Sequence, residues 1–505
     1  MADLYDLLII GGGINGAGIA RDATGRGLKV VLAEQGDLAG YTSSSSTKLI
    51  HGGLRYLEYY EFRLVREALF ERERLLESAP HIIWPLRFIL PHEKGIRPAW
   101  FVRIGLFLYD NLAPRKKLPG TETINLKRHV AGRALKPGFD TAFVYSDCWV
   151  EDSRLVSLNA LDAAERGAEI RVRTRVASAR REGDTWHAVL EDVETGETQA
   201  VRARALVNAA GPWVADVLNA KLGLNTKNNV RLVKGSHIVV PQLFEGDHSF
   251  ILQNRDKRII FAIPYQGRFT LVGTTDVPVD SGPGKAVISD EEVRYLCDAI
   301  NHVFKREIEP SDVVWTYSGV RPLFDDGSSS ASAVTRDYVF DLNAPQGQAP
   351  VLSIFGGKIT TFRKLAEQAL DELKPFFPAM KPTWTENAKL PGGDMPDADF
   401  DRFLADLLRR KPFLAPEHAL RMGRAYGTRI EELLGAAQSW ADLGEDFGAG
   451  LTAAEVDYLV RREWAHSADD ILWRRSKLGL HVPVETAQRI EAYLAEKRTA
   501  AIAAQ

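Results

Sequence analysis

Side chains that suit an anionic substrate lie within six positions, where His51 precedes two glycines, a leucine, Arg55 and Tyr56. The guanidinium group of an arginine binds phosphates or carboxylates through two parallel hydrogen bonds. A neutral imidazole accepts a proton near pH 7. A further arginine, Arg321, lies at the end of a strand-like pattern over 315–323. These residue types predict a site that binds an anion and moves a proton.

A glycine-rich turn at the start of the chain predicts a second site. Gly11-x-Gly13-x-x-Gly16 follows the apolar run 6–10 and opens a stretch of helical periodicity. In such a βαβ unit the glycines permit the tight turn, the backbone approach to a pyrophosphate, and close packing of helix and strand. Glu34 ends the next apolar run, at the spacing expected for the acid that binds a ribose diol. The pattern predicts a dinucleotide-binding domain and disfavours NADP, whose 2′-phosphate this carboxylate would repel.

Later segments predict that the chain returns to this cofactor. The apolar run 205–210 meets Gly211 before a helix predicted from about Val214, and the run 351–355 meets two glycines before a second helix. Small residues at both places allow close backbone approach. The N-terminus of the second helix could stabilise the anion of a reduced flavin ring, which favours FAD over NAD. The serine-rich stretch 42–48 is either a flexible loop or a lining of hydroxyl and N–H groups.

The order of the elements predicts an α/β protein with three parts, in line with the length of 505 residues. Short β-branched runs bounded by glycine and proline between 230 and 320 predict an antiparallel sheet. Beyond a Pro-Gly-Gly turn, a helical and charge-rich pattern predicts a separate α domain. The predicted parts are a discontinuous Rossmann-like FAD-binding domain of the glutathione-reductase or D-amino-acid-oxidase type over 1–80, 146–225 and 335–375, an inserted substrate-binding domain over 81–145 and 226–334, and a C-terminal helical domain over 390–505.

Composition excludes several classes of protein. The net charge is −3, so no broad positive field predicts binding to nucleic acid. Only Cys148 and Cys297 occur, which allows neither a disulfide framework nor a C-x-x-C motif, and we predict no metal site. The first strand begins at once and leaves no room for a signal peptide, which predicts a cytoplasmic protein.

The segment 99–109 comes nearest to a membrane span, but it is too short and carries Arg103. Its aromatic residues and the cations at 115–117 would suit a helix that lies flat in a membrane interface. A buried core helix with a solvated basic end is the plainer interpretation, and the pattern alone favours it.

Seven motifs together resemble the FAD-dependent glycerol-3-phosphate dehydrogenases, most closely the aerobic respiratory type of bacteria. They are 10–16, 48–57, 145–147, 233–237, 273–276, 318–322 and 355–358, and the resemblance covers essentially the whole chain. It implies oxidation of sn-glycerol 3-phosphate to dihydroxyacetone phosphate, with hydride passing from substrate C2 to flavin N5. It also implies ubiquinone as electron acceptor and peripheral attachment to the inner face of the cytoplasmic membrane. With the resemblance included, a helix in the membrane interface and a buried core helix are equally favoured for 97–117. A homodimer is compatible with it.

The substrate of such an enzyme carries a phosphate dianion. Planar guanidinium groups suit this anion, so Arg55, Arg321 and Arg336 are the predicted phosphate ligands, with Tyr56 and Lys358 assisting.

Hydride loss from C2 must be coupled to proton loss from its hydroxyl. His51 is the first candidate base and His237 the second, while Lys358 and Arg321 complete the predicted catalytic set by stabilising charge. The residues predicted to contact FAD are Gly11, Gly13, Ile14, Asn15, Gly16, Glu34, Ser46, Thr47, Lys48, Leu49, His51, Gly52, Val176, Ala210, Gly211, Trp213, Gly356, Gly357, Lys358, Ile359 and Thr360.

Three other functions stay open on the sequence. A glycerol-phosphate oxidase would use O₂ in place of quinone. An amine or amino-acid oxidase shares the predicted fold, although an amine substrate calls for carboxylates or aromatic walls rather than several arginines. A flavin-binding sensor without catalysis would leave His51, Arg55 and Lys358 without a role.

Overall fold

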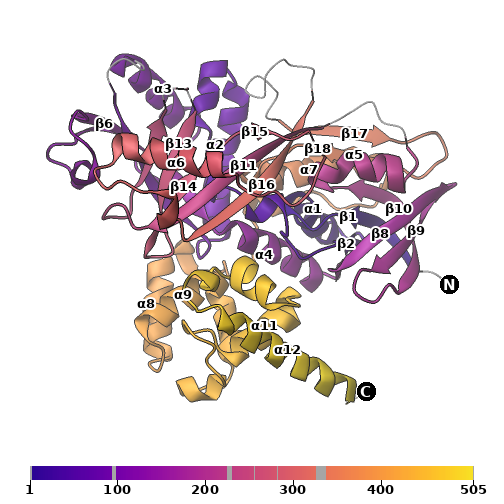
Figure 1. Cartoon of the computed structure of the whole chain (residues 1–505). Coiled ribbons are helices and arrows are strands. Elements are labelled where there is room, and N and C mark those ends of the chain that lie inside the picture. Colours follow the sequence, from indigo (N-terminus) through magenta and orange to yellow (C-terminus); the bar gives the residue numbers. More distant parts are fainter. Residues whose placement is uncertain are drawn as a thin grey trace.

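Two mixed β-sheets form the main body of the computed structural model, and a block of helices lies beneath them (Figure 1). The structure describes residues 3–93, 98–224, 230–254, 256, 258–280, 282–325 and 337–503. The N-terminal strand lies inside the first sheet, whereas the C-terminal helix α12 (Glu485–Ala503) belongs to the helical block.

The first sheet is parallel at its centre, with the order β17-β18-β10-β1-β2-β7. Its strands are β1 (Asp3–Ile10), β2 (Val30–Ala33), β7 (Glu169–Arg171), β8 (Thr174–Glu182), β9 (Thr185–Asp192), β10 (Thr198–Asn208), β17 (Val339–Asn343) and β18 (Val351–Phe355). Helix α1 (Ile14–Gly25) packs against α4 (Asp152–Glu165) and α7 (Phe362–Leu373) in one apolar core with strands β1 and β2. Apolar runs such as 7–10 are fully buried because both faces of the sheet are covered.

The second sheet is mainly antiparallel, with the order β15-β11-β14-β13-β12-β4-β6-β3, and β16 and β5 pair at its sides. Its strands are β3 (Leu49–Ile50), β4 (Ile83–Pro91), β5 (Glu122–Asn125), β6 (Thr141–Val150), β11 (Val230–Pro241), β12 (Ser249–Gln253), β13 (Ile259–Tyr265), β14 (Phe269–Gly273), β15 (Val277–Pro278) and β16 (Trp315–Phe324). The predicted antiparallel sheet, inserted into a Rossmann-like domain, is therefore confirmed.

Three local predictions differ from the structure. The predicted domain boundary at 145/146 falls inside β6, whose pairing with β4 runs unbroken from Ala142 to Val150 and keeps this whole strand in the second sheet. Helix α6 (Asp290–Val303) interrupts the region predicted to be β-rich and begins with a capping box from Ser289. The helix predicted from about Val214 is short, because α5 (Val214–Asp216) passes directly into a π-helical turn.

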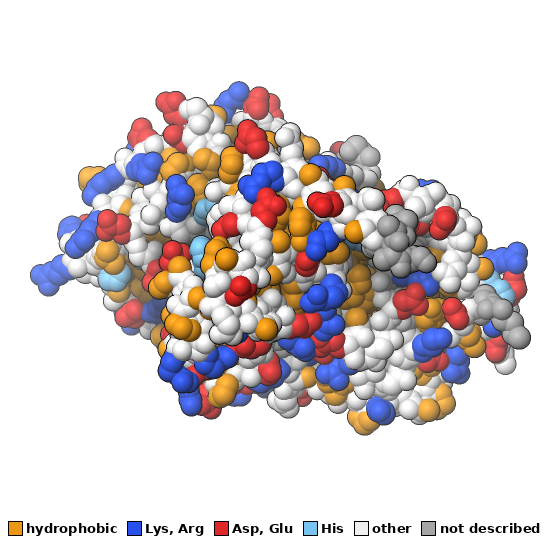
Figure 2. All heavy atoms as spheres, turned by 90° about the horizontal axis from the view of Figure 1, so that it is seen from below, with side chains coloured by type: hydrophobic (Ala, Val, Ile, Leu, Met, Phe, Trp, Pro, Cys, Tyr) orange, Lys and Arg blue, Asp and Glu red, His pale blue; other side chains and the backbone are white. Residues whose placement is uncertain are grey.

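The C-terminal domain is helical and has an apolar core of its own, as predicted. Its helices are α8 (Phe400–Arg410), α9 (Pro416–Tyr426), α10 (Ile430–Leu434), α11 (Ala453–Glu463) and α12. Figure 2 views the molecule from this side and shows acidic and basic side chains intermixed over the surface.

Helix α2 (Phe62–Ser78) is amphipathic and follows a 3₁₀ turn over Leu54–Tyr59. Helix α3 (Ala99–Asn111) follows β4, and the interpretation of its segment as a buried core helix is wrong. Trp100 and Phe107 are 64% and 66% exposed, and only the side facing Leu106 and Tyr109 is buried. Within the described part of the chain, no helix is long and apolar enough to cross a membrane.

Candidate functional site

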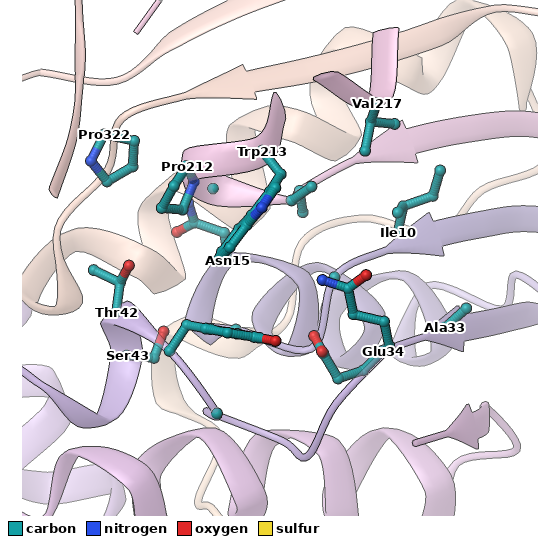
Figure 3. Close-up of a pocket in the computed structure, with 18 of the residues that line it drawn as sticks. Ile10, Asn15, Ala33, Glu34, Thr42, Ser43, Pro212, Trp213, Val217 and Pro322 are labelled. Carbon is teal, nitrogen blue, oxygen red and sulfur yellow. The ribbon is translucent and has the colours of Figure 1, made fainter. Parts of the chain in front are cut away.

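A large cavity lies where the parallel strands β1, β2 and β10 end (Figure 3). It spans about 1350 Å³ when the open space at its mouth is included. Ligands of open α/β sheets bind at this edge of the strands. Predicted cofactor residues that line it are Gly11, Gly13, Ile14, Asn15, Glu34, Val176, Ala210, Gly211, Trp213, Gly356 and Gly357.

The glycine-rich turn requires glycines for reasons of space. Gly11 has φ +110°, and a Cβ there would lie 2.6 Å from the Ala209 carbonyl oxygen. A Cβ on Gly16 would lie 1.9 Å from the Gly11 oxygen, so Gly16 packs behind the turn and does not line the cavity. Beside the turn, Asn15 donates to the Gly356 carbonyl at 3.2 Å, while its buried Oδ1 has no hydrogen-bond partner among the residues that the structure describes. This orphaned acceptor and the open space at the turn fit a bound cofactor.

Glu34 and Ala33 lie at one end of the cavity, and Thr42 and Pro322 lie at the other (Figure 3). The Glu34 carboxylate accepts hydrogen bonds from the backbone N–H groups of Gly12 at 2.6 Å and Gly36 at 2.7 Å. Burial raises the pKa of Glu34, although these two donors lower it in part. The acid expected to hold a ribose diol thus lies at the end of the cavity farther from Thr42 and Pro322.

Replacing Gly13 by alanine is expected to weaken FAD binding by about tenfold or more, because the added methyl group occupies the space through which the backbone approaches a pyrophosphate. Within the protein this methyl group meets only Ser43 Oγ, at 3.1 Å, so folding should persist. Fluorescence titration of the apoprotein with FAD measures the effect, and thermal unfolding without FAD measures folding. Gly105→Ala on α3, which meets nothing within 4 Å, is the control. An unchanged Kd for Gly13→Ala would contradict the assignment.

A second cavity, of about 2160 Å³ with its open mouth, meets the first at Thr42, Pro322, Gly356 and Gly357, which line both. It lies between the two sheets, at the ends of β16 and β18. Predicted substrate and catalytic residues that line it are His51, Arg55, Tyr56, Arg321 and Lys358. Residues separated by about 300 positions in the sequence therefore face one space.

Two cations of this cavity are held in place by neighbours. The Arg321 guanidinium forms an ion pair with Asp276 and donates to Thr274 Oγ1 at 3.0 Å. The Lys358 ammonium lies over the Tyr56 ring, 4.3 Å from its centroid. Both groups are thus oriented by the protein itself, which lowers the entropy lost when they bind an anion.

The structure brings His51 to the cavity but not His237. Burial lowers the pKa of His51, Asp147 raises it in part, and Lys358 lowers it further, so the imidazole is neutral at pH 7. His237 is buried behind the wall, where its Nε2 lies 3.0 Å from the Thr47 hydroxyl and its ring stacks on Tyr317. Burial and the charge of Arg321 hold the pKa of His237 well below its usual value.

Other predicted cofactor contacts divide between the two cavities or lie outside them. Ser46, Thr47, Leu49, Ile359 and Thr360 line the second cavity together with His51 and Lys358.

Lys48 and Gly52 line neither cavity, and their predicted contacts with FAD stay predictions. The Lys48 ammonium is fully buried in an ion pair with Asp152 at 2.8 Å. The Gly52 N–H donates to the Tyr109 hydroxyl at 2.8 Å and to Asp147 Oδ1 at 3.3 Å. Arg336 lies outside the described residues.

Five charged residues of the second cavity were absent from the predicted set: Glu61, Arg63, Asp147, Asp276 and Asp337. Asp147 accepts from Arg72 and from the Tyr109 hydroxyl, at 2.8 and 2.7 Å. Asp147 and Asp276 do stand in motifs that carried the resemblance, and their acidic character was the available signal. Arg63 lies on the polar side of an amphipathic helix, where the sequence pattern offers no signal.

Comparison with known proteins agrees with this geometry. Residues 6–363 match the model of the FAD dependent oxidoreductase family, and residues 383–498 match the C-terminal domain of alpha-glycerophosphate oxidase. The chain is 55% identical to D-erythritol 1-phosphate dehydrogenase of Brucella abortus, with 94% of this chain and 95% of the relative covered. It is 51% identical to the aerobic glycerol-3-phosphate dehydrogenase of Escherichia coli, with 97% of each chain covered.

A solved structure also matches. The glycerol-3-phosphate dehydrogenase from Bacillus halodurans complexed with FAD superposes with a TM-score of 0.76 at 27% identity, over 98% of this chain and 94% of that chain. The predicted fold class, FAD cofactor and family are therefore confirmed. Two abutting cavities, one built on a dinucleotide fingerprint and one lined by cations, lie in a chain that belongs to the family of FAD-dependent glycerol-3-phosphate dehydrogenases.

Proposed function

We propose that the protein oxidises sn-glycerol 3-phosphate to dihydroxyacetone phosphate and passes the electrons to ubiquinone. The observation that carries this proposal is the second cavity, where Arg321, Lys358 and a neutral His51 face one space. That space meets the FAD cavity at Gly356 and Gly357, so a phosphorylated substrate held by the cations lies beside the cofactor.

The residues divide the chemistry between them. Arg321 and Arg55 bind the phosphate dianion through charge-assisted hydrogen bonds. FAD, when bound, supplies the hydride acceptor. The His51 imidazole takes the proton of the substrate hydroxyl, which its lowered pKa permits because the ring is uncharged at neutral pH. Lys358, held over Tyr56, stabilises the charge that develops on the substrate oxygen.

A four-carbon polyol phosphate is a second candidate substrate. The relative from Brucella abortus is named for D-erythritol 1-phosphate, and the second cavity has room for a longer chain. The test compares kcat/KM of the holoenzyme for glycerol 3-phosphate, D-erythritol 1-phosphate and glycerol. We expect glycerol 3-phosphate to be used best and glycerol hardly at all, because glycerol offers the cations no anion. A preference for D-erythritol 1-phosphate would contradict the proposed substrate, but it would leave the assignment of the phosphate-binding residues intact. A kcat/KM for glycerol equal to that for glycerol 3-phosphate would contradict the assignment of these cations to phosphate binding.

The electron acceptor is tested separately, since a glycerol-phosphate oxidase would share the substrate site. Oxygen consumption and quinone reduction are measured side by side with glycerol 3-phosphate. We expect rapid reduction of a soluble ubiquinone analogue and slow oxygen uptake. Oxygen uptake that matches the turnover without quinone would contradict the acceptor assignment.

Exposed apolar side chains support attachment to the inner face of the cytoplasmic membrane. Tyr60 is 80% exposed, and on α3 Trp100 and Phe107 are exposed as well. Tyr59 is 47% exposed and also lines the second cavity, so this surface reaches the catalytic space. Aromatic residues on a helix that lies flat bury well in a lipid interface, where a quinone would be within reach. A homodimer stays a prediction.

Replacing Trp100 and Phe107 together by serine is expected to weaken vesicle binding by about tenfold or more, because each aromatic side chain contributes about 1.5–3 kcal/mol when buried. Flotation with vesicles that contain anionic lipid measures the bound fraction. Val484→Ser in the C-terminal domain, where Val484 is 83% exposed, is the control for the loss of an exposed apolar group. If the double variant binds vesicles as well as wild type does, α3 does not contribute to membrane attachment.

A further inference from the structure

A short loop over residues 34–39 lies at the wall of the FAD cavity. It links Glu34, at the ribose end of that cavity, to the C-terminal domain. Glu34 begins this loop and accepts from the N–H groups of Gly12 and Gly36, so the loop and the glycine-rich turn are held together. Ala39 closes the loop by donating to the Gly12 carbonyl at 3.1 Å. A shift of the residues between Glu34 and Ala39 would therefore move the wall of the cavity.

The C-terminal domain binds this loop through the side chain of Asp37. Arg475 binds the Asp37 carboxylate through both terminal nitrogens, each at 2.7 Å, and Arg474 Nε donates to it at 2.6 Å. The side chains of Asp37 and Arg475 are 2% and 0% exposed. Charge-assisted bonds in a buried setting are strong and directional, so the position of Asp37 depends on these two arginines.

The same turn of the C-terminal domain also supports the neighbouring segment of the cavity wall, which begins at Arg173. Asp470 binds Arg173 Nη2, with both carboxylate oxygens at 2.9 Å, and forms an ion pair with Arg474. The Arg173 N–H donates to the Gly36 carbonyl at 2.8 Å, and residues 174–176, which follow it, line the FAD cavity.

We propose that the turn Asp470–Arg475 is a positioning element of the FAD site, so that FAD affinity depends on docking of the C-terminal domain. The turn lines neither the FAD cavity nor the second cavity. It acts through Asp37 and Arg173 on the two segments of the FAD cavity wall near Glu34. Coupling of this kind is reciprocal, and bound FAD strengthens the docking in turn. The proposal rests on the FAD site and is independent of the substrate.

The test replaces the two partners of the buried pair and measures FAD binding without turnover. Asp37→Asn and Arg475→Met are each expected to raise the Kd of the apoprotein for FAD about tenfold or more, because each removes the buried bidentate contact that anchors Asp37 and so displaces the loop. The double variant should bind FAD no more weakly than the poorer single variant. Arg475→Lys should fall between wild type and Arg475→Met, since it keeps the charge but loses the two-pronged contact.

A matched control crosses the same domain interface away from the cavity. Glu165 on α4 pairs with Arg429 at 2.7 Å and with Arg462 at 2.6 Å, both of the C-terminal domain. Glu165→Gln should leave the Kd for FAD within twofold of wild type. Limited proteolysis with and without FAD adds a second readout, because FAD should protect the connection between the domains in wild type and Glu165→Gln but not in Asp37→Asn.

Two results would overturn the proposal. One is an Asp37→Asn protein that binds FAD as tightly as wild type. The other is a Glu165→Gln protein that loses as much affinity as Asp37→Asn, which would mean that docking in general, rather than the grip on Asp37, holds the cofactor. Should Arg475→Met fail to fold, Asp37→Asn and Arg475→Lys carry the same comparison.

Discussion

Replacing Arg321 by alanine is expected to lower kcat/KM for glycerol 3-phosphate by a factor corresponding to about 2–5 kcal/mol, or roughly 30- to 5000-fold. The loss has two parts. The phosphate dianion loses a guanidinium that Asp276 and Thr274 hold in orientation. The Asp276 carboxylate then lacks its partner and faces the dianion, which adds repulsion. Steady-state kinetics with the holoenzyme measure the change.

The control for Arg321→Ala is Arg204→Ala. Arg204 pairs with Asp6 at 3.2 Å on the surface and lines neither cavity. We expect its kcat/KM to match wild type and both variants to retain FAD. Kinetics of Arg321→Ala within twofold of wild type would remove Arg321 from the substrate site.

Replacing His51 by asparagine is expected to slow flavin reduction by about 10²- to 10⁴-fold without loss of FAD, because the proton of the substrate hydroxyl loses its acceptor. Anaerobic stopped-flow measurement follows the step directly. The pH dependence provides a second signature. In wild type the rate should be level near pH 7 and fall at acid pH, since the pKa of His51 is lowered by burial and only the neutral ring accepts a proton. Asp147, Lys358 and Arg72 are the charged groups that set this pKa.

His237→Asn separates the two candidate bases. The His237 ring stacks on Tyr317 behind the cavity wall, so this variant should retain the acid limb of the pH profile that His51→Asn loses. An unchanged rate and an unchanged acid limb in His51→Asn would transfer the role of base to another group.

Local sequence patterns were sufficient for the parts of the fold that depend on period and turn chemistry. The run 6–10, the three glycines and Glu34 predict a βαβ unit because strand, tight turn and ribose acid are all local to about thirty residues. Three cations of the second cavity, Arg55, Arg321 and Lys358, were also found, and Arg63 was missed. Arg55 and Arg321 come together only through the pairing of distant strands. Their chemistry, rather than their spacing, pointed to a shared site.

Features that depend on tertiary packing were missed. The predicted domain boundary at 145/146 falls inside β6, whose pairing with β4 continues past it, because single-sequence patterns do not contain register. Lys48 stands among hydroxyl residues but turns to Asp152, since a buried cation requires a partner. The apolar sequence of α3 suits a buried core helix and a helix in a membrane interface equally well. Only the fold shows that Trp100 is exposed.

The grip of Arg474 and Arg475 on Asp37 could not be predicted either, because the partners come from opposite ends of the chain. Charged residues in a helical domain are most often solvated, and these two arginines look like any others in the sequence. Their burial at the interface gives them a role.

The measurement that tests the central claim most directly is an anaerobic titration of the purified holoenzyme with glycerol 3-phosphate, followed at the flavin band near ~450 nm. The account predicts bleaching by glycerol 3-phosphate and none by glycerol or amino acids, because the phosphate must engage Arg321 and the hydroxyl must lie near His51. A yellow protein that glycerol 3-phosphate does not bleach would contradict the substrate assignment and leave the FAD fold in place.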